Sequence, residues 1–219
     1  MFNFLPSLPD LITYGIILLT AFPVHEFAHA WTADRFGDDT PRANGRLTLN
    51  PLAHLDPIGS LMMILAGFGW AKPVPINPYV LQRRLPAAPM LVSLAGPMSN
   101  FLMAILASVP FRLGLVSIHD ISQLSGSVLP NIPTFLFIFI YINLLLMLFN
   151  LIPVFPLDGE KVLDYLLPPS GARVLESIRP YGPMILMVLL FILPLAGIDV
   201  IGKVIQPALG FLTQLLIGA

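Results

Sequence analysis

The sequence predicts an all-α polytopic membrane protein with about five to six transmembrane helices. Hydrophobic residues make up 56% of the 219-residue chain and charged residues only 11%, whereas a soluble domain carries about 25% charged residues. Apolar runs of about 20 residues, the length that crosses the hydrocarbon core, recur along the chain. The chain has no cysteine, which excludes a disulfide framework and a thiolate metal site.

The first long apolar run covers residues 10–33, and the polar, turn-rich stretch 34–57 follows it. Within that stretch, RLTLN (46–50) alternates as a short strand does. Residues 58–70 are apolar but too short to cross comfortably, which favours a re-entrant or interfacial segment. Residues 72–84 are rich in proline, which favours an extended strand or edge over a helix. We therefore expect a short membrane-associated β-hairpin or re-entrant region between the first and second long spans.

The remainder of the chain alternates between apolar runs and polar connections. We expect further spans at residues 86–111, 133–153 and 182–198, joined by a short polar connection at 112–132 and a loop at 154–180. The last run, 200–217, is long enough to cross once more, and lying in the interface is the alternative.

The basic residues predict how the chain is oriented in the membrane. Nine of the eleven Lys and Arg fall in two connections, between the first and second and between the third and fourth long spans. The nine are Arg35, Arg42, Arg46, Lys72, Arg83, Arg84, Lys161, Arg173 and Arg179. Because basic residues favour cytoplasmic loops, both connections are expected on the cytoplasmic side of a multi-pass cell (inner or plasma) membrane protein.

The motif HEFAH (25–29) places two imidazoles and a carboxylate inside the first apolar run. Ionisable groups in a membrane helix are costly unless they are paired, hydrated or bound. His25 and His29 are four residues apart and therefore share a helix face, where they can bind one metal ion. Glu26 lies beside that face, where it can act as a general base toward a water on the metal. The alternatives are a chance match and a structural His–Glu hydrogen bond.

A catalytic zinc ion usually takes three protein ligands, so one more is expected. The candidates are His54, Asp56, His119, Asp158 and Glu160. Asp158 follows a span that breaks at Pro153 and Pro156, and such a break can direct a carboxylate back toward the first span. These considerations favour Asp158 over His54, while a simple turn role for Asp158 before Gly159 is the alternative.

Two motifs together resemble the site-2 protease family of intramembrane zinc metalloproteases. One is HEFAH in an apolar helix, and the other is N-x-x-P-x-x-x-x-D-G at Asn150, Pro153, Asp158 and Gly159. The compact bacterial and archaeal branch is resembled by further segments, which are Asn50-Pro51, His54, Asp56-Pro57, Gly59, GWAKPVPINP (69–78) and GPMSN (96–100). The resemblance covers roughly residues 20 to 165.

The resemblance implies that His25, His29 and Asp158 bind one Zn²⁺ and that Glu26 is the catalytic base. It also implies that Asn150 lies near the zinc and helps to orient substrate or an oxyanion. Many members of the family carry a PDZ or CBS domain, and we expect neither here. We expect residues 1–219 to form a single integral-membrane protease domain, with a catalytic core at about 10–165 and C-terminal helices at 180–219.

Three polar residues outside the main motifs have two interpretations each. Gly96-Pro97 and Asn100 fit either a closely packed helix start or a substrate-side role, and Asn100 in a span needs a hydrogen-bond partner. His54 either bonds within its loop or helps to hold the mouth of the site, and we therefore include Asn100 and His54 with Asn150 as candidates for substrate or transition-state support. Asn143 fits a hydrogen bond within the helix bundle.

We therefore expect an enzyme, a zinc-dependent intramembrane endopeptidase with its active site nearer the cytoplasmic side. Its substrate would be the transmembrane segment of a regulatory or remnant membrane protein, as in regulated intramembrane proteolysis; the resemblance implies partners such as membrane-tethered anti-sigma factors. Because a helix masks its own peptide bonds, the substrate must unwind, and 46–50 or 72–77 could hold it by strand addition. Membrane lipid is a partner, and no basic patch indicates nucleic acid. The alternative is a non-proteolytic metal-binding protein or metal transporter in the membrane, and a catalytically inactive scaffold is a third possibility.

Overall fold

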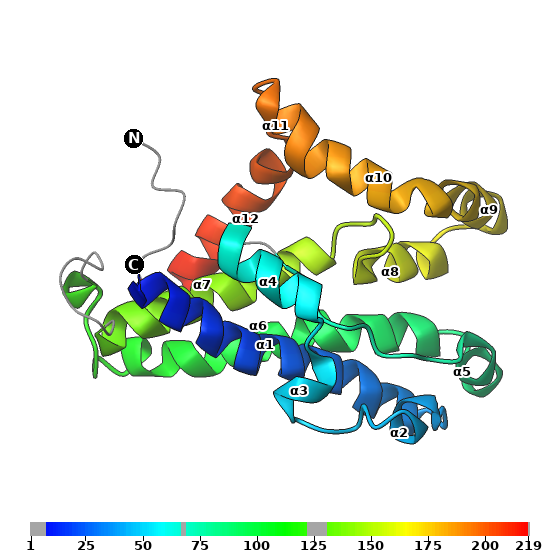
Figure 1. The fold of residues 1–219 in the computed structure, drawn as a ribbon, viewed down its shortest axis with the longest axis horizontal. Helices are drawn as coiled ribbons and strands as arrows, with labels where there is room; N and C mark the ends of the chain where they lie inside the picture. Colours follow the sequence, from blue (N-terminus) through cyan, green and yellow to red (C-terminus); the bar gives the residue numbers. More distant parts are fainter. Residues whose placement is uncertain (1–7, 67–68, 122–130, 219) are drawn as a thin grey trace.

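The computed structural model describes residues 8–66, 69–121 and 131–218, and its regular elements are helical (Figure 1). The helices are α1 (Leu8–Arg35), α2 (Thr40–Ala43), α3 (Pro51–His54), α4 (Pro57–Ala66), α5 (Pro78–Arg84), α6 (Ala88–Arg112), α7 (Ile132–Asn150), α8 (Asp158–Leu166), α9 (Pro169–Ile178), α10 (Gly182–Met187), α11 (Leu193–Leu195) and α12 (Val200–Ile217). The all-α prediction is confirmed for these ranges.

Four helical segments of the described chain are long and apolar enough to cross a membrane, and the protein is therefore a multi-pass membrane protein. They are α6, α7, the continuous segment Pro169–Leu195 that contains α9 to α11, and α12. Because the described residues contain four such segments, the predicted count of five to six spans is not supported. The predicted span 182–198 is part of a helical segment that already begins at Pro169, so the end of the predicted loop 154–180 is helical as well.

The predicted β-hairpin is wrong for the residues that the structure describes. Neither 46–50 nor 72–77 forms a strand, and a single antiparallel bridge joins Leu55 to Ala71. The end of the predicted extended stretch 72–84 is the helix α5. It can start there because proline is favoured at a first helical position, and the Asn77 side chain accepts hydrogen bonds from the amides of Tyr79 and Val80.

The predicted re-entrant segment 58–70 contains α4, and its residues 67 and 68 lie outside the described part of the chain. With 10 residues, α4 is about 15 Å long and too short to cross the hydrocarbon core.

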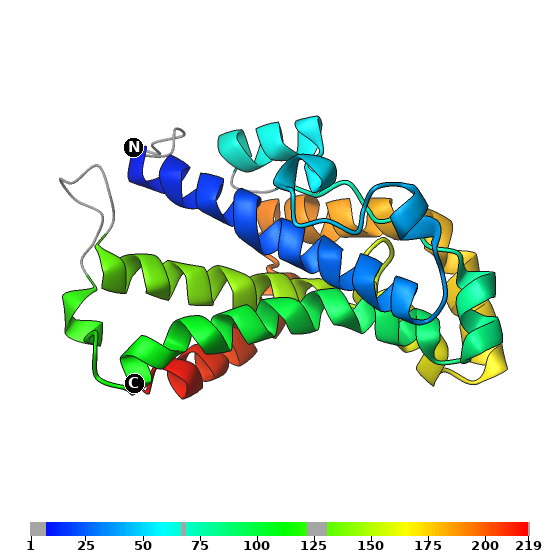
Figure 2. The ribbon, with the colours of Figure 1, turned by 90° about the horizontal axis from the view of Figure 1, so that it is seen from below.

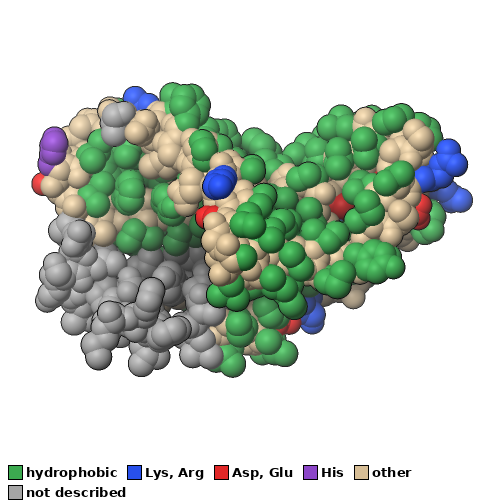
Figure 3. Space-filling model, turned by 90° about the horizontal axis from the view of Figure 1, so that it is seen from above, with side chains coloured by type: hydrophobic (Ala, Val, Ile, Leu, Met, Phe, Trp, Pro, Cys, Tyr) green, Lys and Arg blue, Asp and Glu red, His purple; other side chains and the backbone are tan. Residues whose placement is uncertain are grey.

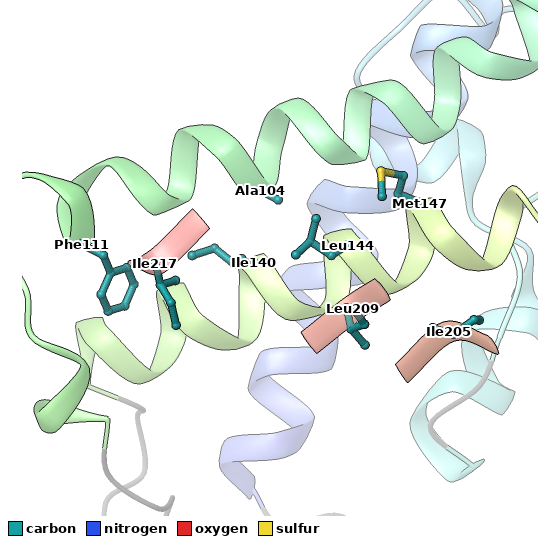
Figure 4. Packing of buried hydrophobic residues seen from close by; sticks show 8 residues of the cluster. All are labelled: Ala104, Phe111, Ile140, Leu144, Met147, Ile205, Leu209 and Ile217. Carbon is teal, nitrogen blue, oxygen red and sulfur yellow. The ribbon is translucent and has the colours of Figure 1, made fainter. Parts of the chain in front are cut away.

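The long helices form a bundle in which α6 contacts α1, α7 and α12. Figures 1 and 2 show α1, α6 and α7 running side by side along the bundle. The main core lies where α6, α7 and α12 meet (Figure 4), and its buried members are Ala104, Phe111, Ile140, Leu144, Met147, Ile205, Leu209 and Ile217. Small residues such as Ala104 let helix backbones approach, and in lipid this close packing holds helices together.

The outer surface carries many large apolar side chains, as expected of a protein in contact with lipid. Hydrophobic side chains cover most of the face in Figure 3, with a group of Lys and Arg at its right-hand end. The helices α2, α5 and α9 lie at that same end of the bundle (Figures 1 and 2). They carry Arg42, Arg83, Arg84 and Arg173.

Candidate metal centre

The helix α1 presents His25 and His29 side by side in the interior. Both imidazoles are buried, and their Nε2 atoms lie 3.0 Å apart. The two rings meet edge to face with centroids 4.6 Å apart. The predicted sharing of one helix face is therefore realised, and both Nε2 atoms point to the same place.

Asp158 reaches the same place from the first residue of α8. Its Oδ2 lies 3.3 Å from Nε2 of His25 and 3.3 Å from Nε2 of His29. Within the described residues these three form the group whose ligand atoms lie close enough to hold one metal ion. A tetrahedral zinc ion with bonds of about 2.0–2.1 Å separates its ligand atoms by about 3.3 Å. The three spacings therefore fit zinc.

Hydrogen bonds behind the imidazoles determine which ring nitrogens face the centre. Nδ1 of His29 lies 2.7 Å from the carbonyl oxygen of Val92, and Nδ1 of His25 lies 2.6 Å from Oδ1 of Asn100. A carbonyl oxygen only accepts, so Nδ1 of His29 is the protonated nitrogen and donates to Val92. Two imidazole electron pairs and a carboxylate that converge in this way need a positive charge between them.

Gly96 on α6 provides the space in which that charge fits. A Cβ added at Gly96 would collide with the ring of His29 and would lie 2.6 Å from Nε2 of His25. The missing side chain thus leaves a cradle beside both Nε2 atoms. Val92, Gly96 and Asn100 are spaced four residues apart and form one stripe on α6 that faces the two histidines.

Glu26 borders the same space. Its side chain is buried, and its Oε2 accepts a hydrogen bond of 3.2 Å from the backbone amide of Val74. The amide belongs to the segment 72–77, which has no regular secondary structure and through Val74 lies against the centre. A carboxylate in this place can take up and release a proton next to the ligands.

A cavity of about 680 Å³ opens onto the centre. Its lining includes the three metal-ligand candidates, Glu26, Asn150, Lys161 and mostly apolar side chains. The apolar part of the wall comes from Phe22, Trp70, Val74, Ile76, Leu146, Phe149 and, on the C-terminal segment, Pro183, Leu186, Met187, Leu190 and Phe191. Sequence reasoning missed this last group, because its apolar residues look like those of any lipid-facing span.

The remaining candidates for substrate support differ in position. Asn150 lines the cavity and donates through Nδ2 to the carbonyl of Leu146 at 3.0 Å. Asn100 is fully buried behind His25, away from the residues that line the cavity. His54 is also fully buried, with Nε2 2.7 Å from the Thr48 carbonyl, and it is not part of the cavity wall. Gly96 and Pro97 lie inside α6, so the predicted helix start there is wrong.

The other candidates for the third ligand have different partners. Asp56 accepts hydrogen bonds from the amides of Ile58 and Gly59 at the start of α4. Glu160 is buried and bonds Arg179, with Oε1 2.8 Å from Nε and 2.5 Å from Nη2. His119 lies in a 3₁₀ turn after α6 and is exposed.

Comparisons with known proteins relate the chain to metalloproteases. The model of peptidase family M50 matches residues 112–193. "Putative zinc metalloprotease YwhC" of Bacillus subtilis is 41% identical over 190 residues, which cover 86% of this chain and 84% of that protein. "Putative zinc metalloprotease Rip2" is 34% identical over 179 residues in Mycolicibacterium smegmatis and 32% over 177 residues in Mycobacterium tuberculosis strain H37Rv.

The matches to the two Rip2 proteins cover 78% of this chain but only 64% and 63% of their own lengths. No solved structure matches the chain significantly. The similarity to YwhC extends over most of both proteins, and the chain therefore belongs to peptidase family M50.

Proposed function

We propose that the protein is a zinc-dependent intramembrane endopeptidase in which His25, His29 and Asp158 bind the metal and Glu26 is the base. The convergence of three ligand atoms at zinc spacing, with a buried carboxylate beside them in one cavity, carries this proposal. Membership of peptidase family M50 and the zinc metalloprotease names of the relatives support the enzyme class and the metal.

The residues around the metal divide the chemistry of peptide hydrolysis. A zinc ion in this position lowers the pKa of water and polarises a carbonyl group. Glu26 takes the proton of the attacking water and later returns it to the leaving nitrogen. Asn150, on the same cavity wall, is placed to orient the substrate carbonyl. The largely apolar wall keeps bulk water away from these steps and accepts an apolar substrate segment.

We place the centre within the membrane and nearer to its cytoplasmic side. With 28 residues, α1 is about 42 Å long, enough to cross as a fifth span. His29 precedes Arg35 at the end of α1 by about 9 Å of helix rise. The helices α2, α5 and α9, with their arginines, lie at that end (Figures 1 and 2), and basic ends face the cytoplasm.

The substrate that fits this arrangement is a transmembrane segment of a regulatory or remnant membrane protein, with anti-sigma factors as one class. Its helix must open locally, since an intact helix hides the scissile bond in its own hydrogen bonds. The segment 72–77 has no regular secondary structure and bonds Glu26 through the Val74 amide, and we propose that it holds the opened stretch. We treat residues 1–219 as one catalytic unit, because residues between 183 and 191 complete the cavity wall.

The decisive experiment compares zinc content and cleavage of a reconstituted transmembrane substrate for wild type, Glu26→Gln and Asp158→Ala. We expect Glu26→Gln to keep zinc and lose cleavage, and Asp158→Ala to lose zinc. Asp34→Asn is the matched control: this half-buried carboxylate later on α1 pairs with Arg42 outside the cavity, so the variant should keep zinc and cleavage. Full cleavage of the substrate by folded Glu26→Gln would refute the mechanism. A wild-type protein that binds zinc but does not cleave the substrate would favour the metal-binding or transport alternative.

A further inference from the structure

Two carboxamides, Asn100 on α6 and Asn143 on α7, are completely buried between apolar helices. Nδ2 of Asn100 donates to Oδ1 of Asn143 at 3.0 Å, and Nδ2 of Asn143 donates to the carbonyl of Phe139 at 2.8 Å. Oδ1 of Asn100 lies 2.6 Å from Nδ1 of His25. Buried amides are costly unless bonded, and here the bonds form one continuous chain from α7 to α1.

The chain of hydrogen bonds has a fixed direction. The carbonyl of Phe139 can only accept, so Asn143 turns its amide nitrogen toward it and its oxygen toward Asn100. Asn100 must then donate its own nitrogen, which leaves its oxygen for His25. That oxygen also only accepts, so the proton of His25 sits on Nδ1 and the electron pair sits on Nε2, facing the metal position.

We infer that Asn143 and Asn100 are positioning residues that set the tautomer and the ring orientation of His25 for zinc binding. The inference rests on the proposed function in one respect, that His25 binds the metal. It gives Asn100 a role different from substrate contact, because its oxygen is taken up by His25. His29 needs no such side chains, since the main-chain carbonyl of Val92 does the same for it.

The test measures the zinc dissociation constant of the purified full-length protein in detergent, by competition with a chelator. Asn100→Leu removes the acceptor, and we expect a 10- to 100-fold weaker affinity, the usual effect of losing an outer partner of a ligating histidine. Asn143→Leu lets the Asn100 amide turn over, so a smaller loss, about 3- to 10-fold, is expected. The absorption band of the Co²⁺-loaded protein should change in both variants.

A double substitution gives the sharpest result. Asn100→Asp keeps an acceptor for His25, and both carboxylate oxygens accept, so no partner is needed to choose between them. We therefore expect Asn143→Leu to cost no further affinity in the Asn100→Asp background. If Asn143→Leu costs the same zinc affinity in the wild-type and Asn100→Asp backgrounds, the positioning role of the two asparagines is refuted. The comparison does not need Asn100→Leu, so it still decides if that variant does not fold.

Two further variants separate this inference from the proposed function. Ser108→Ala removes another buried polar group of α6, whose hydroxyl donates to the Ile105 carbonyl at 2.7 Å within its own helix, and should leave zinc affinity unchanged. His25→Ala should abolish tight zinc binding. Unchanged zinc binding in His25→Ala would refute the metal site itself. If His25→Ala loses zinc binding but folded Asn100→Leu keeps wild-type zinc affinity, only the positioning role of Asn100 and Asn143 is refuted.

Discussion

Gly96 offers the most direct test of the metal centre, through the single substitution Gly96→Ala. The added methyl carbon would lie 2.6 Å from Nε2 of His25, and that atom would have to retreat by about 0.8 Å to reach the 3.4 Å of ordinary contact. The ring of His29 would have to move as well. Metal–ligand distances tolerate only about 0.2 Å, so at least one imidazole would leave the zinc ion.

The expected loss of zinc affinity in Gly96→Ala can be estimated from the binding free energy of structural zinc sites. Four ligands together contribute about 10–16 kcal/mol of apparent binding free energy, or roughly 3 kcal/mol for each ligand. We therefore expect Gly96→Ala to weaken zinc at least about 100-fold.

The assay is zinc content after equilibration in buffers of defined free zinc, with the unfolding transition recorded as a check on folding. The matched control is Gly210→Ala in α12, where an added Cβ meets nothing within 4 Å. It should keep wild-type affinity. A folded Gly96→Ala protein with wild-type zinc affinity would refute the placement of the metal between His25, His29 and Gly96.

Three other predictions concern the surroundings of the centre. Val74→Pro removes the amide that bonds Glu26, so cleavage should fall by about tenfold with zinc content unchanged. Val74→Ala keeps the amide and should be far less affected. Arg179→Met leaves the carboxylate of Glu160 buried without its partner, which should lower the free energy of unfolding by about 3 kcal/mol in a denaturant titration. An equal effect of Arg173→Met, whose Nε donates to the Pro169 carbonyl in its own helix, would contradict this. Chelation should lower the unfolding temperature of wild type, since zinc at 100 times its dissociation constant stabilises by about 2.7 kcal/mol, but it should not change that of Asp158→Ala.

The sequence predicted the two parts of the centre because their chemistry is local. His25 and His29 share a face on any helix, and a span that breaks at proline directs Asp158 inward. The structure places all three ligand atoms within 4.8 Å of one another. The helical class was predictable for a similar reason, since backbone groups in lipid must be satisfied within the chain.

The β-hairpin was predicted wrongly because alternation alone does not make a strand, which also needs a partner strand. Pro73 and Pro75 have no amide to give to a ladder. The guanidinium of Arg46 donates to the carbonyls of Ala53 and Lys72 instead, and this side chain holds the two stretches together where a ladder was expected. Neither of these two hydrogen bonds of Arg46 can be predicted from the spacing of residues in the sequence.

The role of Asn100 was equally hidden, because it depends on which helix faces which. A polar residue in a span calls for a partner, but only the packing of α6 against α1 identifies that partner as His25. The packing also explains Gly96, whose lack of a side chain has meaning only once the two imidazoles lie against it.

The position of Asp158 has a consequence for the order in which a ribosome makes this protein. More than half of the chain lies between His29 and Asp158, so the histidine pair is synthesised long before its carboxylate partner exists. With the proposed ligand set, a growing chain that has reached only α7 holds two of the three ligands and would not retain zinc as the finished protein would. The peptidase therefore stays inactive during most of its own synthesis, while neighbouring nascent helices are being inserted beside it.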